Sequence, residues 1–82
     1  MRLPRDLSGL EFAKLLSRYG YEVTRQAGSH IRLTSAFRGS QHHITVPAHK
    51  SLKLGTLIGI LSEVATYLEM GRADVERDLF GS

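Results

Sequence analysis

The stretch YEVTRQAGSHIRLT, residues 21–34, decides the fold of this chain. Its two ends, residues 21–27 and 30–34, alternate apolar with polar side chains and are rich in β-formers, which predicts two strands. Gly28-Ser29 between them predicts a short turn. A loop at 36–41 with Gly39 follows, then a third strand at 42–46, where Pro47 stops the hydrogen-bonding ladder. Three short strands with short connections predict an antiparallel meander.

Along the sequence, one helix is expected before this meander and another after it. Ser8, with Glu11 three residues later, matches a capping box, and Gly20 supplies a left-handed stop. In the next helix the apolar residues from Leu54 to Leu68 hold helical phase over four turns, and Gly71 is its expected terminator. Gly59 inside it costs about 1 kcal/mol relative to alanine and predicts a close approach to the sheet. The helical apolar positions are Phe12, Leu15, Leu16 and Tyr19, then Leu54, Leu57, Ile58, Leu61, Ala65 and Leu68.

The resulting order is α-β-β-β-α, followed by a short helix over residues 73–80 with Val75 and Leu79 on one side. The predicted class is α+β, with two helices on one face of a three-stranded antiparallel sheet and the other face open. We expect a single domain over residues 1–82, with its core at about 8–70 and an acidic extension at 71–82. Three roles are open for this extension: it packs on the core, it self-associates, or it binds a partner protein.

Composition limits the class of protein further. A chain of 82 residues buries only about 60–65% of its unfolded surface, so we expect modest stability. The absence of cysteine excludes disulfides and thiolate metal sites, and it fits a reducing cytoplasm. No apolar run approaches the ~20 residues of a membrane span, and residues 1–10 lack the apolar stretch of a signal peptide. We therefore expect a cytoplasmic protein with no membrane partner.

Forty consecutive residues, 23–62, contain no aspartate or glutamate. A carboxylate-free surface with cations and imidazoles favours an anionic polymer and offers groups that move protons near neutral pH. The window therefore points toward nucleic acid. The alternative is a chance fluctuation of surface charge. The window holds His30, His42, His43 and His49, together with Arg25, Arg32, Arg38, Lys50 and Lys53.

Strand parity locates the histidines, because side chains alternate between the two faces of a strand. If the apolar residues of the second and third strands point into the core, their neighbours point to the open face. His42 has the buried parity and is expected at a strand end or edge. The open face then carries His30, Arg32, Thr34, His43 and Thr45.

His30 is the best candidate for chemistry, because it follows a glycine–serine turn that can bring backbone donors close to a phosphate. Magnesium-dependent phosphodiesterases need carboxylates, and none lies between Glu22 and Glu63. A zinc site of four histidines would need two loops and two strands to converge. Acid–base chemistry on RNA without metal or cofactor remains, in which the 2′-hydroxyl is the nucleophile and one histidine contributes about 10²–10⁴-fold. The alternative is an ordinary solvated histidine.

Two lysines, Lys50 and Lys53, precede the second predicted helix. A helix N-terminus attracts phosphate through its dipole and free amides, and flanking lysines add charge. The alternative is that they only make the loop soluble.

Taken together, these segments resemble the HicA family of bacterial toxin–antitoxin RNA-cleaving toxins. The resemblance covers about residues 8–70. It implies a fold like the double-stranded-RNA-binding domain, with His30, at the position of the family's Gly-Ser-His motif, as the catalytic residue. It also implies cleavage of mRNA without the ribosome and a HicB-type antitoxin that covers the active face. The matching segments are Ser8-Gly9, Tyr19-Gly20-Tyr21, Gln26-Ala27-Gly28-Ser29-His30, Val46-Pro47-Ala48-His49, Leu52-Lys53-Leu54-Gly55-Thr56-Leu57 and Ile60-Leu61.

The leading hypothesis is thus a metal-independent RNA-cleaving toxin with His30 as general base or acid. His43 and His49 are weaker candidates for a second proton shuttle. One alternative is a non-catalytic RNA-binding module of the same fold, whose binding depends on salt but not on His30. A third is a small adaptor acting through its open sheet edge, which leaves the acid-free window unexplained. The expected RNA contacts are Ser29, Arg32, His43, His49, Lys50 and Lys53.

Overall fold

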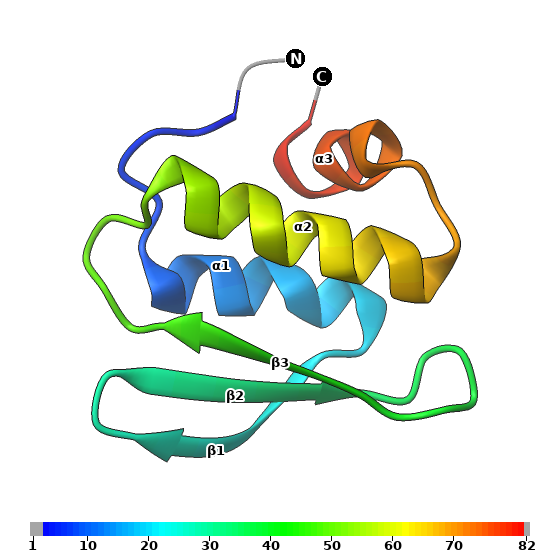
Figure 1. The fold of residues 1–82 in the computed structure, drawn as a ribbon, viewed down its shortest axis with the longest axis horizontal. Coiled ribbons are helices and arrows are strands. Elements are labelled where there is room, and N and C mark those ends of the chain that lie inside the picture. Colours follow the sequence, from blue (N-terminus) through cyan, green and yellow to red (C-terminus); the bar gives the residue numbers. More distant parts are fainter. Residues whose placement is uncertain (1–2, 82) are drawn as a thin grey trace.

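The computed structural model describes residues 3–81 and has the predicted α+β class (Figure 1). No helix among these residues has the length and hydropathy to cross a membrane. The elements are α1 (Gly9–Leu16), the 3₁₀ helix η1 (Ser17–Tyr19), β1 (Glu22–Ala27), β2 (His30–Ser35), β3 (His42–Pro47), α2 (Leu54–Leu68) and α3 (Arg72–Phe80).

The three strands form an antiparallel sheet in the order β1-β2-β3, so the predicted meander is confirmed. Gly28 has φ 58°, a left-handed conformation that glycine adopts without strain, and it allows the tight turn before His30. Register places Arg32 opposite Thr45 and Thr34 opposite His43. The β1–β2 register shifts between Val23 and Arg25, which leaves a bulge in the outer strand.

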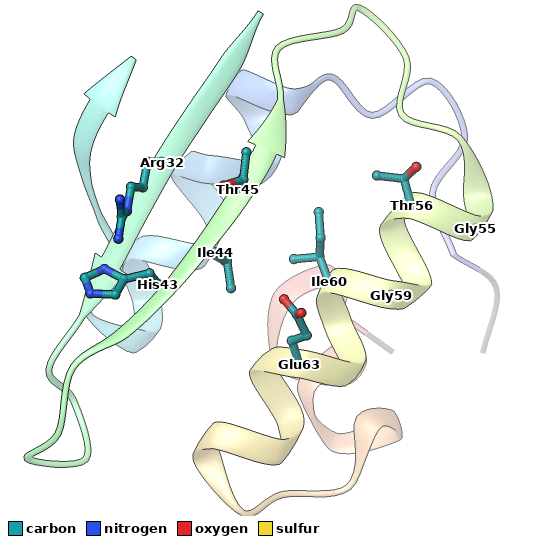
Figure 2. Close-up of a pocket in the computed structure, with 9 residues that line it drawn as sticks. All are labelled: Arg32, His43, Ile44, Thr45, Gly55, Thr56, Gly59, Ile60 and Glu63. Atoms are coloured by element: carbon teal, nitrogen blue, oxygen red, sulfur yellow. The ribbon is translucent and has the colours of Figure 1, made fainter. Parts of the chain in front are cut away.

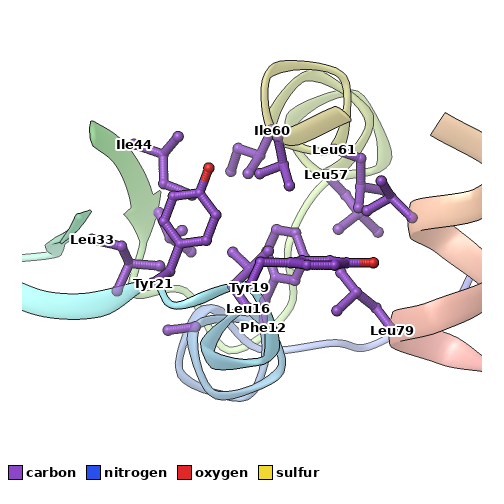
Figure 3. Packing of buried hydrophobic residues seen from close by; sticks show 14 of the residues in the cluster. Phe12, Leu16, Tyr19, Tyr21, Leu33, Ile44, Leu57, Ile60, Leu61 and Leu79 are labelled. Carbon is purple, nitrogen blue, oxygen red and sulfur yellow. The ribbon is translucent and has the colours of Figure 1, made fainter. Parts of the chain in front are cut away.

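The helices α1 and α2 cover one face of the sheet, and α3 lies against α2 on the side away from the strands (Figure 1). Ile31 and Leu33 of β2 are fully buried, while their neighbours on the strand are exposed or half-buried, so the predicted strand parity is confirmed. Figure 3 shows side chains of all three helices meeting those of the sheet in one core. The opposite face of the sheet, here called the open face, is uncovered.

The start of α1 is fixed by its cap and by contact with β3. Ser8 Oγ accepts from Glu11 N–H at 3.0 Å, and the Glu11 carboxylate accepts from Ser8 N–H at 2.9 Å, so the capping box is confirmed. Those hydrogen bonds lower the pKa of the Glu11 carboxyl. An added Cβ at Gly9 would lie 1.9 Å from the Pro47 carbonyl oxygen. Only glycine therefore allows α1 to approach β3 this closely.

Two local expectations, both about glycines, were wrong. The left-handed residue after α2 is Glu69, at φ 56°, rather than Gly71, which precedes α3. Glu69 N–H donates to Thr66 O and Met70 N–H to Ala65 O, a Schellman motif that ends the helix early enough for α3 to turn back. Gly59 makes no close approach to the sheet, because an added Cβ there meets nothing within 4 Å. Val23 is 54% exposed, since it lies beside the bulge in an edge strand.

The C-terminal extension packs on the core, the first of the three roles considered for it. Val75 and Leu79 of α3 are buried, and Phe80 stacks on Phe12 with ring centroids 6.3 Å apart. The Tyr19 hydroxyl donates to Asp78 Oδ2 at 2.6 Å. Burial and this carboxylate raise the pKa of Tyr19 well above its ordinary value.

Candidate nucleic-acid interface

His30 stands on the open face, as predicted, with two guanidinium groups beside it. It begins β2 directly after the Gly28-Ser29 turn, and its side chain is exposed. An open cavity of about 360 Å³ is lined by His30, Arg25, Ala27, Arg32 and Thr45. Within residues 3–81 the His30 imidazole forms no hydrogen bond, so both ring nitrogens are available to a ligand. An imidazole between cations can exchange a proton while the cations hold an anion.

Two backbone hydrogen bonds bring three separate sequence segments together at this end of the sheet. Ala48 N–H donates to Ser29 O at 2.6 Å, and Gly9 N–H donates to His49 O at 2.9 Å. The turn that carries His30 is therefore joined to the end of β3, and the end of β3 is joined to the start of α1. The position of His30 therefore depends on how α1 packs against Pro47.

A row of hydrogen bonds crosses the open face at the other end of β2. Thr24 Oγ1 of β1 lies 2.9 Å from Thr34 Oγ1 of β2, which lies 2.8 Å from His43 Nδ1 of β3. His43 is exposed, as predicted, and its ring is oriented by a hydrogen bond with the Thr34 hydroxyl. Sequence parity identified His43 and Thr34, whereas Thr24 was missed because it lies in the bulge of β1, where the register with β2 shifts.

His42, next to His43, has a structural role. Its Nδ1 lies 2.7 Å from the Tyr21 hydroxyl, and its ring stacks on Tyr67 with centroids 4.7 Å apart. Burial, with the nearby Tyr67 and Glu63, raises the pKa of Tyr21, so its hydroxyl stays protonated. The parity argument that set His42 apart from the open face is consistent with this half-buried position.

A groove of about 550 Å³ runs around the free edge of β3 to α2. Figure 2 shows Ile44 pointing toward Ile60 of α2, while Arg32 and His43 lie on the other side of the strands. The wall formed by α2 has no side chain at Gly55 and Gly59. Glu63 also lines the groove. The absence of acidic residues from positions 23–62 of the sequence therefore does not leave the folded surface around these residues free of carboxylates. Sequence reasoning missed this wall because helix packing brings it to the strands.

The other predicted contacts lie in the connection between β3 and α2. His49 and Lys50 are exposed in this connection, and Lys53 is the N-cap residue of α2, with extended backbone and no side-chain cap. None of the three lines the cavity that contains His30. They extend the cationic surface along the chain and do not complete the histidine site.

The cations of the open face form no ion pairs within residues 3–81. The ion pairs in this part of the chain are Arg38–Glu69, Arg72–Glu76 and Arg77–Asp74, all away from His30. Arg25 and Arg32 therefore keep their charge for an external anion. In the same range no three histidine or carboxylate side chains are grouped as metal ligands would be.

Fold and site together define a small α+β domain whose uncovered sheet face presents imidazoles and unpaired guanidinium groups. The family model described as the HicA toxin of bacterial toxin–antitoxin systems matches residues 9–65, which is more than half of the chain. The chain therefore belongs to the HicA toxin family and is the toxin of a toxin–antitoxin system, which implies an antitoxin partner. No curated protein and no solved structure matched the chain.

Proposed function

We propose that this chain is a metal-independent endoribonuclease that cleaves mRNA in the cytoplasm at the open face of its sheet. The observation that supports this most directly is the exposed His30 imidazole in one cavity with Arg25 and Arg32. Family membership adds support, because HicA toxins are known as mRNA interferases.

The chemistry needs few groups. The His30 imidazole accepts the proton of a ribose 2′-hydroxyl, and the 2′-oxygen forms a bond to the adjacent phosphorus. The bond from phosphorus to the 5′-oxygen then breaks, and that oxygen takes a proton from imidazolium or water. The products are a 2′,3′-cyclic phosphate and a 5′-hydroxyl. Arg25 and Arg32 stabilise the charge that develops on the phosphoryl oxygens.

The remaining predicted contacts add to the binding of RNA around the His30 site. Ser29 lies in the turn before His30, while His49, Lys50 and Lys53 follow β3. Phosphate contacts by the cations make binding depend on salt. A HicB-type antitoxin would silence the toxin by covering the open face. Adding the product of a neighbouring antitoxin gene should then suppress RNA cleavage.

The decisive variant is His30→Ala. Because the side chain is exposed, the variant should keep the midpoint of thermal unfolding, yet lose about 10²-fold or more of the cleavage rate. Lys14→Ala, which removes an exposed cation on α1, is the control and should cleave like the unmodified protein. The assay follows fragments of a labelled single-stranded RNA, with and without EDTA.

Other results would contradict the proposal in distinguishable ways. Cleavage by His30→Ala at the original rate would remove His30 from the reaction. Loss of cleavage in EDTA would show a need for metal. Salt-sensitive RNA binding by the unmodified protein without any fragments would favour the non-catalytic RNA-binding module.

A further inference from the structure

The hydrogen-bonded row of Thr24, Thr34 and His43 fixes the orientation of the His43 ring. The Thr24 hydroxyl has one proton and two possible acceptors, Thr34 Oγ1 at 2.9 Å and Arg32 O at 3.5 Å. The 2.9 Å bond to Thr34 is the shorter of the two, and either hydroxyl can be its donor. On its other side Thr34 Oγ1 forms a hydrogen bond with His43 Nδ1, 2.8 Å away. Because Thr34 occupies Nδ1, Nε2 is the ring nitrogen left for a ligand, as a donor when Nδ1 accepts and as an acceptor when Nδ1 donates.

The oriented His43 ring lies too far from His30 to share its phosphate. His43 is opposite Thr34, four positions along β2 from His30. At about 3.3 Å per residue the separation along the strand is roughly 13 Å. Arg32 lies between the two positions on the same face. A second proton transfer to the same phosphorus is therefore a poor role for His43, and contact with a neighbouring nucleotide fits the spacing better.

The surroundings of His43 suit a nucleobase. A cavity of about 300 Å³ is lined by Thr24, Thr34, Gln41, His43, Arg25 and Arg32. Ligand sites for small molecules begin near ~300 Å³, so the space fits one base rather than a duplex. The Gln41 amide offers a donor and an acceptor, and guanidinium planes are surfaces on which unpaired bases stack. Arg25 and Arg32 line the His30 cavity too, so the two cavities adjoin.

We propose that Thr24, Thr34, Gln41 and His43 form a subsite that recognises one base of single-stranded RNA next to the bond cleaved at His30. This inference rests on the proposed function. The recognised base forms a hydrogen bond with His43 Nε2, and Thr34 is the positioning residue that holds the ring in this orientation. Double-stranded RNA is a poor substrate, because its paired base edges are not accessible to such a pocket.

The test compares cleavage sites rather than rates alone. A pool of single-stranded RNA with random sequence is cleaved, and the base frequencies around each cut are read by sequencing. Thr34→Val removes the hydroxyl with little change of shape and should reduce the preference at one position about 2- to 10-fold, the worth of one hydrogen bond. Thr34→Ser should restore the preference. Thr66→Val is the matched control, because that exposed hydroxyl on α2 bonds only to Ser62 O.

Each result bears on the proposal. Flattened preference in Thr34→Val and Gln41→Ala, with rescue by Thr34→Ser, supports the subsite. An unchanged base preference with uniformly slower cleavage overturns it, and so does an unmodified protein that cuts without preference or cuts duplexes equally well. If the unmodified protein yields no fragments, the proposed function fails instead. Affinities of the same variants for short oligonucleotides that differ at one base then decide the subsite separately.

Discussion

Gly9→Ala tests the contact that links α1 to the histidine site. The new Cβ would lie 1.9 Å from the Pro47 carbonyl oxygen and 2.9 Å from the Pro47 carbonyl carbon. Both are backbone atoms that no rotamer change can move, so the start of α1 must shift by at least about 1 Å to restore contact distances. That shift also breaks the 2.9 Å bond from Gly9 N–H to His49 O.

The expected cost follows from these two effects. Forcing a methyl group into packed structure costs about 1–3 kcal/mol, and the lost hydrogen bond about 0.5–1.5 kcal/mol. We therefore expect the free energy of unfolding to fall by about 2–4 kcal/mol, which for a domain of this size lowers Tm by at least ~8 °C. Urea titrations followed by circular dichroism measure this directly.

Gly59→Ala is the matched control, since it makes the same chemical change inside α2 where an added Cβ meets nothing within 4 Å. It should stabilise the protein by about 0.5–1 kcal/mol through helix propensity. The two variants should thus move stability in opposite directions. A Gly9→Ala protein within about 0.5 kcal/mol of the original would refute the packing argument.

Two further predictions concern the helical side of the protein. Leu79→Ala should lower the free energy of unfolding by about 2–5 kcal/mol in a single urea transition, because Leu79 is buried in the common core; a separate early transition of α3 would contradict this. Stability should also fall as pH rises above about 10, because the raised pKa values of Tyr19 and Tyr21 let the unfolded chain lose those protons first. Urea midpoints between pH 8 and 11 should show this fall, and a Tyr19→Phe, Tyr21→Phe double variant should reduce it.

Local patterns predicted the order of the elements and the bounds of the strands to within about a residue, and they predicted which face of β2 and β3 each side chain occupies. His30 and Arg32 could be placed together because they lie two residues apart on one strand, where parity alone decides. The Gly28-Ser29 turn could likewise be predicted from the sequence, because its conformation depends on these two residues and not on contacts with distant segments.

Features that depend on distant packing were not predictable. Thr24, which bonds to Thr34, lies in the bulge where the register of β1 with β2 shifts, and nothing in the composition of β1 marks that bulge. Glu63 reaches the groove through the docking of α2, so counting acids along the chain could not locate it. Glu69 takes a left-handed backbone that sequence patterns assign to glycine, because the return of α3 requires a turn there.

The position of α3 has a practical consequence for anyone who shortens the gene. The span that matches the family ends at residue 65, yet Val75 and Leu79 belong to the same hydrophobic cluster as α1 and the sheet. A protein cut at that boundary would uncover Phe12, which loses the aromatic ring stacked on it. Such a fragment would aggregate or be degraded, and its harmlessness to cells could be mistaken for the loss of a catalytic group.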